Sequence, residues 1–176
     1  EILNADNTGD AVTAVASKIT RSDGIVCQRV TFTSNGTGTN AESNGSETFR
    51  IRQTSSTNIT EATNIVAGKW WQASAQIAIY NAGSTAGLLE EFFLQLDDTT
   101  SGSETARGFS NLADTDDGFP LLDTPYFELR THPIKLEGST GLDIDVYVDV
   151  ADNLTGSFAM DICNLTVRQI PADQAP

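Results

Sequence analysis

The chain has 176 residues, of which 10 are Lys or Arg and 24 are Asp or Glu, so its formal net charge is −14. This length suits one domain of ordinary size, and the acidic balance excludes an unaided nucleic-acid binder and disfavours docking on anionic lipid. A single His and two Cys are too few soft ligands for a structural zinc site, and no apolar run reaches the roughly 18 residues of a membrane span.

The first clear strands are predicted in the first third of the chain. Residues 24–33 are rich in β-branched side chains, and residues 49–53 alternate between apolar and polar side chains. The segment between them, residues 34–48, consists mostly of Ser, Thr, Asn and Gly, which favour turns. It is therefore predicted to be a polar loop.

The strongest strand pattern covers residues 69–80. Apolar and polar side chains alternate along this segment, which is typical of an antiparallel strand with one buried face. The residues predicted to face the core are Trp71, Ala73, Ala75, Ile77 and Ile79. The residues predicted to face outward include Trp70, Gln72, Gln76 and Tyr80. A register slip of one residue would exchange Trp70 and Trp71 between the two faces.

Further strands are predicted towards the C-terminus. Residues 88–97 fit either a helix or a strand, and the alternation of Phe92, Leu94 and Leu96 favours the strand. A loop rich in Asp, Thr, Ser and Gly is expected over 97–120, with one short strand near 105–110. The remaining predicted strands are residues 126–131, 142–150 and 157–170. Asn164 lies in the last of them, where a glycan on its Asn-Leu-Thr sequon would not fit.

About eight strands and no substantial helix predict an all-β fold, an antiparallel β-sandwich of the jelly-roll type. The strands are expected to form a single domain over residues 1–170. A C-terminal tail or linker is expected over residues 171–176.

Several short motifs, spread over nearly the whole chain, resemble one known family. They are Ile-Leu-Asn-Ala-Asp-Asn at 2–7, the strand after Ser22-Asp23-Gly24, Val-Ala-Gly-Lys-Trp-Trp-Gln-Ala-Ser at 66–74, and Phe-Ala-Met-Asp-Ile-Cys-Asn-Leu-Thr-Val at 158–167. In this order they resemble the jelly-roll carbohydrate-binding modules of the broad family 4/9/22 type. Jelly rolls of this kind also occur in virion fibres and head spikes.

The resemblance implies a jelly-roll fold, carbohydrate binding and a structural calcium ion held in part by Asp161. The chain departs from the family at residues 7–8, where Asn-Thr stands near the family's Phe-Glu. In these jelly rolls the first and last parts of the chain pair in one sheet. Cys27 and Cys163 are therefore expected to lie close together, either as a disulfide or as two buried thiols.

The predicted carbohydrate site is a polar sheet face that carries aromatic rings. Aromatic rings stack on the C–H faces of sugars, while amides, carboxylates and Arg bind sugar hydroxyls. The outward residues of three strands would meet on this face if those strands are neighbours. These residues are Trp70, Gln72, Gln76, Tyr80, Tyr126, Arg130, Asp145 and Tyr147. The alternative is an ordinary solvated face on which a loop covers Trp70.

Three aspartates are candidate ligands of a structural calcium ion. Asp114 and Asp116 belong to the segment Asp-Thr-Asp-Asp-Gly, whose clustered carboxylates suit a cation that takes six to eight oxygen ligands. Asp161 is the third. The alternatives are an acidic solvated loop for the first two, and for Asp161 a hydrogen bond to a neighbouring loop.

Catalysis is not expected. His132 is the single His and has no nucleophile signature beside it. Neighbouring acids such as Glu90 and Glu91 point to opposite faces of a strand, unlike the two acids of a glycosidase.

The predicted function is therefore an extracellular, non-catalytic module that binds a polysaccharide or cell-surface glycan. The net charge predicts a neutral or weakly cationic glycan over a polyanionic one, unless calcium bridges the two. The alternative is a structural domain of a virion fibre, head spike or particle surface, assembled as a homo-oligomer or gripping a host polysaccharide.

Overall fold

The computed structural model describes residues 2–4, 11–38, 46–54, 66–80, 85, 87–98, 107–109, 113–114, 126–137 and 142–174. Within these residues twelve strands form two six-stranded sheets, and the helical content is one short 3-10 turn at Ala172–Gln174. The predicted all-β antiparallel sandwich is therefore confirmed. No helix in this part of the chain is long and apolar enough to cross a membrane.

The strands divide equally between the two sheets. Sheet A contains β1 (Ile2–Asn4), β4 (Ser46–Thr54), β6 (Leu89–Asp98), β7 (Arg107–Phe109), β8 (Ala113–Asp114) and β11 (Leu142–Ala151). Sheet B contains β2 (Val12–Thr20), β3 (Val26–Asn35), β5 (Trp70–Tyr80), β9 (Phe127–Arg130), β10 (Ile134–Lys135) and β12 (Thr155–Ile170).

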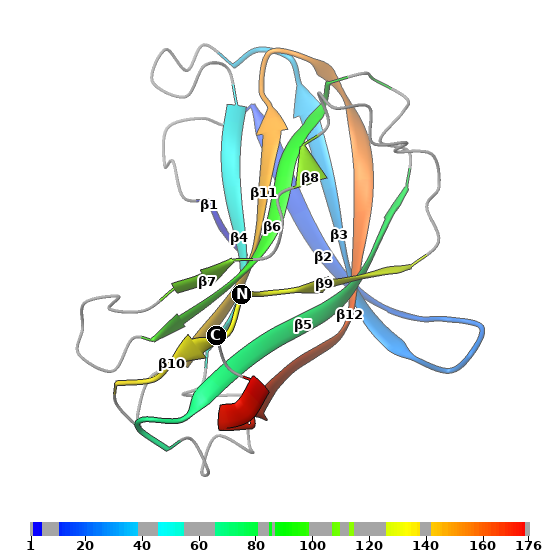
Figure 1. Ribbon diagram of the computed structural model, residues 1–176. Coiled ribbons are helices and arrows are strands. Elements are labelled where there is room, and N and C mark those ends of the chain that lie inside the picture. The colour runs from blue at the N-terminus through cyan, green and yellow to red at the C-terminus, as the bar shows by residue number, and fades with distance from the viewer. Residues whose placement is uncertain are drawn as a thin grey trace.

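The chain crosses repeatedly between the sheets, as it does in a jelly roll. Sheet A has the order β1-β4-β11-β6-β7, with β8 also on β6, and sheet B has the order β10-β5-β12-β3-β2, with β9 also on β5. The last strand, β12, therefore lies between β3 and β5 (Figure 1). The described residues contain twelve strands, more than the expected eight, partly because the two-residue strands β8 and β10 are too short to show a sequence pattern.

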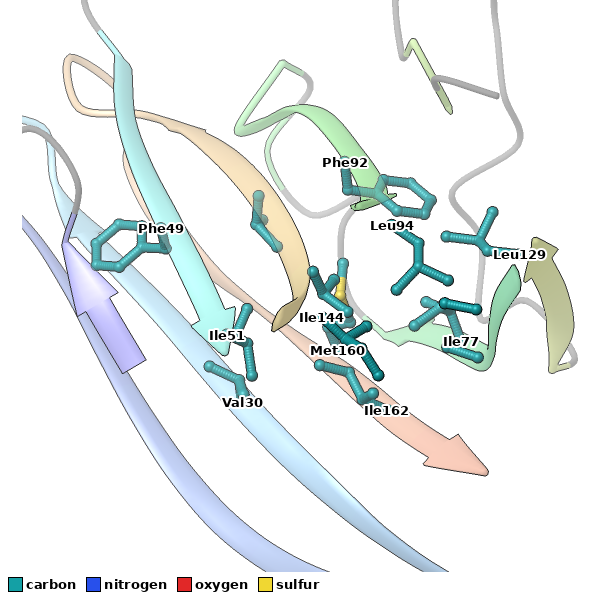
Figure 2. Close-up of a cluster of buried hydrophobic side chains, with 14 of the residues drawn as sticks. Val30, Phe49, Ile51, Ile77, Phe92, Leu94, Leu129, Ile144, Met160 and Ile162 are labelled. Atoms are coloured by element: carbon teal, nitrogen blue, oxygen red, sulfur yellow. The ribbon is translucent and has the colours of Figure 1, made fainter. Parts of the chain in front are cut away.

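The inward faces of both sheets form one apolar core. Trp71, Ala73, Ala75, Ile77 and Ile79 of β5 are all buried, which confirms the predicted register of this strand. Figure 2 shows side chains of both sheets meeting in this core, among them Leu94 from β6 and Ile77 from β5. Each such side chain stabilises the fold by about 1.5–3 kcal/mol relative to an exposed position.

A disulfide joins Cys27 of β3 to Cys163 of β12, which confirms the first of the two expected arrangements. The two residues lie directly opposite each other, with their Cα atoms 4.5 Å apart, the spacing of a non-hydrogen-bonded antiparallel pair. Immediately beyond, the register of β12 against β5 shifts between Cys163 and Thr166, and Asn164 has a φ of 48°. This is a β-bulge. Asn164 is exposed at this bulge. The expectation that it occupies a core position, where a glycan would not fit, is therefore wrong.

Candidate functional site

Six of the eight residues predicted to bind carbohydrate lie together on the outer face of sheet B. They are Trp70, Gln72, Gln76 and Tyr80 of β5, Arg130 of β9, and Tyr126 immediately before β9. Their meeting follows from the antiparallel pairing of β9 with β5, in which Arg130 lies opposite Ser74. Since Ser74 alternates with the buried Ala73 and Ala75, Arg130 also points outward.

The other two predicted residues, Asp145 and Tyr147, do not belong to this face. They lie on β11, which pairs with β4 and β6 in sheet A. The condition under which Asp145 and Tyr147 would join this face, that their strand is a neighbour of β5, is therefore not met. Alternation along β11 correctly predicts that both side chains point away from the core, but they do so on the opposite side of the sandwich.

One half of the sheet B face is a set of fixed polar contacts around Asp161. Its two carboxylate oxygens accept hydrogen bonds from Arg29 at 2.6 and 2.8 Å, and the Tyr126 hydroxyl donates a third at 2.9 Å. The Asp161 side chain is fully buried, whereas that of Arg29 is 34% exposed. These charge-assisted bonds raise the pKa of Arg29, which stays cationic.

Two aromatic rings complete this group. The Arg29 guanidinium lies over the ring of Tyr80 at 4.8 Å, and that of Arg21 lies over the ring of Tyr126 at 3.8 Å. Arg21 also donates to Gln76 and pairs with Asp23. Burial first, and then the hydrogen bonds to Tyr80 and Asp161, raise the pKa of the Tyr126 hydroxyl, which therefore stays protonated. We call these residues the tyrosine cluster: Arg21, Arg29, Gln76, Tyr80, Tyr126 and Asp161.

The carboxylate of Asp161, a predicted calcium ligand, is occupied by protein donors in this structure. Both of its oxygens already accept hydrogen bonds from Arg29 and Tyr126, so a calcium ion at Asp161 would compete with these bonds. The alternative expectation, Asp161 hydrogen-bonded to a neighbouring segment, agrees with its bond from Tyr126. Asp116 and the side chain of Asp114 lie outside the described residues. Among the residues that are described, no three His, Cys, Asp or Glu side chains gather as a metal site.

The other half of the sheet B face is more open. Gln72 is held at both ends of its amide, because it donates to the backbone oxygen of Thr131 at 2.8 Å and accepts from Arg168 at 2.9 Å. Hydrogen bonding to Arg130 above all, with a smaller field from Arg168, lowers the pKa of Glu128. We call this surface the open strip, and its residues are Trp70, Gln72, Ser74, Glu128, Arg130, Thr166 and Arg168.

The outer face of sheet A also carries a polar group, but its side chains are buried or paired with one another. Arg52 donates to both oxygens of Asp145, at 2.8 and 2.7 Å, and Asp145 is fully buried. The ring of Tyr147 stacks on that of Phe93 with a centroid distance of 4.7 Å, under the guanidinium of Arg50. Tyr147 is only 9% exposed. Asp145 and Tyr147 therefore serve contacts within sheet A.

Asp143, beside this group, makes stability depend on pH. Burial raises the pKa of its carboxyl, and the cation of Arg52 at 3.3 Å only partly opposes this. Because the folded-state pKa is raised, the contribution of Asp143 is most favourable at acid pH and declines as the carboxyl ionises. We expect Asp143→Asn to be more stable than the wild type at pH 7, with the gain fading towards pH 3.

Urea denaturation of both proteins across this pH range measures the difference. The exposed Asp173→Asn is the matched control and should follow the wild type at every pH. A gain that does not change with pH, or no gain at pH 7, would contradict the burial of an ionised Asp143.

No protein-family profile and no curated protein sequence matches this chain. Among solved structures, one that is similar comes from work on the promiscuous specificity of carbohydrate-binding modules of the β-sandwich superfamily. It has a TM-score of 0.57 and 13% sequence identity, and the match covers 95% of this chain and 56% of that one. A second, an exo-β-agarase, has a TM-score of 0.41 and 10% identity, over 97% of this chain and 25% of that one.

This chain therefore spans about half the length of the first of these structures and a quarter of the second. At 13% identity the first similarity shows the shared β-sandwich fold alone.

Proposed function

We propose that this chain is a non-catalytic carbohydrate-binding module that holds a polysaccharide or cell-surface glycan on the outer face of sheet B. The observation that carries the proposal is the open strip, where Trp70 lies two residues from Gln72 on the outward side of β5 and the Gln72 amide is held by Thr131 and Arg168. The β-sandwich that the chain shares with a carbohydrate-binding module supports it.

The chemistry of the open strip suits a sugar chain. Trp70 is a partly exposed residue, and its indole ring is the kind of flat apolar surface that stacks on the C–H face of a pyranose. Gln72 is anchored by Thr131 and Arg168, so its amide loses little conformational entropy when it exchanges hydrogen bonds with sugar hydroxyls. Glu128 is paired with Arg130 at 2.8 Å, which suits binding rather than the two-acid chemistry of glycoside hydrolysis.

The disulfide supports an extracellular or particle-surface location as part of this proposal. Disulfides form and persist in oxidising surroundings and are rare where thiols are kept reduced. Both sulfurs are almost fully buried, since Cys27 is 3% and Cys163 2% exposed.

Substitution of the indole tests the proposal. We expect Trp70→Ala to weaken glycan binding about tenfold, because stacking and burial of one aromatic ring contribute roughly 1–2 kcal/mol. Affinity electrophoresis through a panel of neutral and acidic polysaccharides, followed by calorimetry on those that bind, measures the change. Gln72→Ala should weaken the same interaction by a smaller factor.

Val15→Ala is the matched control, because Val15 is 63% exposed on β2, at the other edge of the same sheet. Its affinity should equal that of the wild type. The proposal fails if no polysaccharide retards the wild-type protein, or if Trp70→Ala, once shown to be folded by its unfolding transition, binds as Val15→Ala does.

A further inference from the structure

The two sheets of this acidic protein carry opposite charge. Among the strands that the structure describes, those of sheet B contain five basic and two acidic residues, whereas those of sheet A contain three basic and nine acidic residues. The basic residues of the sheet B strands are Lys18, Arg29, Arg130, Lys135 and Arg168. The described strands of sheet B therefore carry a net charge of 5 − 2 = +3, whereas the whole chain carries −14.

Ion pairing leaves an excess of positive charge beside the open strip. Arg29 is neutralised by Asp161, and Arg130 by Glu128. Among the described residues, neither Arg168 nor Lys135 has a carboxylate within ion-pairing distance. Arg168 contacts the neutral amide of Gln72.

The sheet register places these cations along the proposed glycan path. Lys135 lies opposite Trp70 on one side of β5, and Arg168 lies opposite Gln72 on the other side. Arg130 follows opposite Ser74. Each step of two residues along β5 is about 6.6 Å, so the cations flank the row of Trp70, Gln72 and Ser74 at short, regular intervals.

We propose that the glycan held on this face is anionic, with carboxylate or sulfate groups that pair with Arg168 and Lys135. This inference rests on the proposed function and replaces the sequence-based expectation of a neutral or weakly cationic glycan. That expectation used the charge of the whole chain, whereas a ligand responds chiefly to the field where it binds.

The guanidinium groups have the donors that this recognition needs. A guanidinium has five N–H donors in a planar fork, which matches the oxygens of a carboxylate or sulfate. In the described part of the chain Arg168 makes one hydrogen bond, to the amide oxygen of Gln72. The carboxylates of sheet A lie on the other side of the core, at least the sheet spacing of about 10 Å away, whereas Arg168 and Lys135 border the open strip directly.

Matched pairs of oligosaccharides that differ only in charge provide the test. One pair is oligogalacturonate and its fully methyl-esterified form, and the other is a sulfated carrageenan oligosaccharide and its desulfated form. We expect the wild-type protein to bind the acidic member of at least one pair about tenfold more tightly than the neutral member, by calorimetry at 0.15 M salt. The two pairs distinguish carboxylate from sulfate as the recognised group.

The double variant Lys135→Gln/Arg168→Gln should reduce this ratio of affinities to less than about threefold. Lys18→Gln is the control, because Lys18 is an exposed cation of sheet B on the distant strand β2, and it should keep the wild-type ratio. Equal or tighter binding of the neutral members, or a ratio that survives in the folded double variant, overturns the inference and leaves the proposed function standing. No binding of any member, together with no binding across the polysaccharide panel, overturns the proposed function itself.

Discussion

Removal of the disulfide in the variant Cys27→Ala/Cys163→Ala is expected to lower the free energy of unfolding by about 3–5 kcal/mol. The two cysteines are 136 residues apart, so the bond closes most of the chain into one loop. In the chain-entropy account, a loop of this length strongly restricts the unfolded ensemble, and its loss favours unfolding. Denaturation by guanidinium chloride measures the change as a shift of the midpoint.

Reduction provides an internal check on the same quantity. The wild-type protein unfolded in the presence of dithiothreitol should lose about as much stability as the double variant, and dithiothreitol should not affect the variant. A double variant within 1 kcal/mol of the wild type would show that the bond contributes little. A reductant effect on the variant would show that the loss has another cause.

The second large effect is expected at the buried carboxylate of the tyrosine cluster. Asp161→Asn should lower the free energy of unfolding by about 2–3 kcal/mol, because it leaves the Arg29 cation facing an amide that partly donates. The cost falls below that of a fully buried pair, since Arg29 is 34% exposed. Urea denaturation measures this loss of stability as a lower midpoint at an unchanged slope.

Replacing both partners separates the cost of a broken pair from the value of the intact pair. Arg29→Met/Asp161→Leu should recover most of the stability lost in Asp161→Asn, because apolar substitutes leave no buried charge unpaired. Glu128→Gln, which breaks the exposed pair with Arg130, should cause no measurable change and is the matched control. If the double variant loses more than Asp161→Asn does, the pair itself is strongly stabilising.

The faces of the strands could be predicted from the sequence, because one buried face leaves a period of two. On β5 the inward residues from Trp71 to Ile79 agree with the prediction, as do Ile144, Val146 and Val148 on β11. Six of the eight proposed glycan contacts follow from this alternation and from the pairing of β9 with β5.

Sheet membership could not be predicted in the same way. Alternation gives the side of a strand on which a residue lies and carries no signal of which strand lies beside it. For this reason the sequence does not show that Asp145 and Tyr147 lie on the opposite side of the sandwich from Trp70. The sequence gives no signal for strand β2, because Val-Thr-Ala-Val-Ala-Ser-Lys-Ile-Thr has no buried face over most of its length. It is an edge strand, and Ala16 to Lys18 are exposed.

The bulge in β12 made Thr166 and Arg168 of the open strip unpredictable from alternation along the strand. Before it, Asp161 and Cys163 point outward, and beyond it Thr166 and Arg168 do so. Counting in steps of two from Asp161 would place Val167 on the outer face and Arg168 in the core. The extra residue at the bulge reverses this order, and the sequence signals it only weakly, through an Asn that tolerates positive φ.

The position of the disulfide also determines how the chain would respond to a mechanical load. Strand β12 pairs with β3 as far as Cys163, and beyond that residue it continues along β5 alone. Tension applied at residue 170 is therefore expected to separate residues 164–170 from β5 before the force acts on the disulfide. This separation releases about 25 Å of contour length. Everything between Cys27 and Cys163, including the indole of the open strip, lies within the closed loop and is shielded from a pull on the two ends.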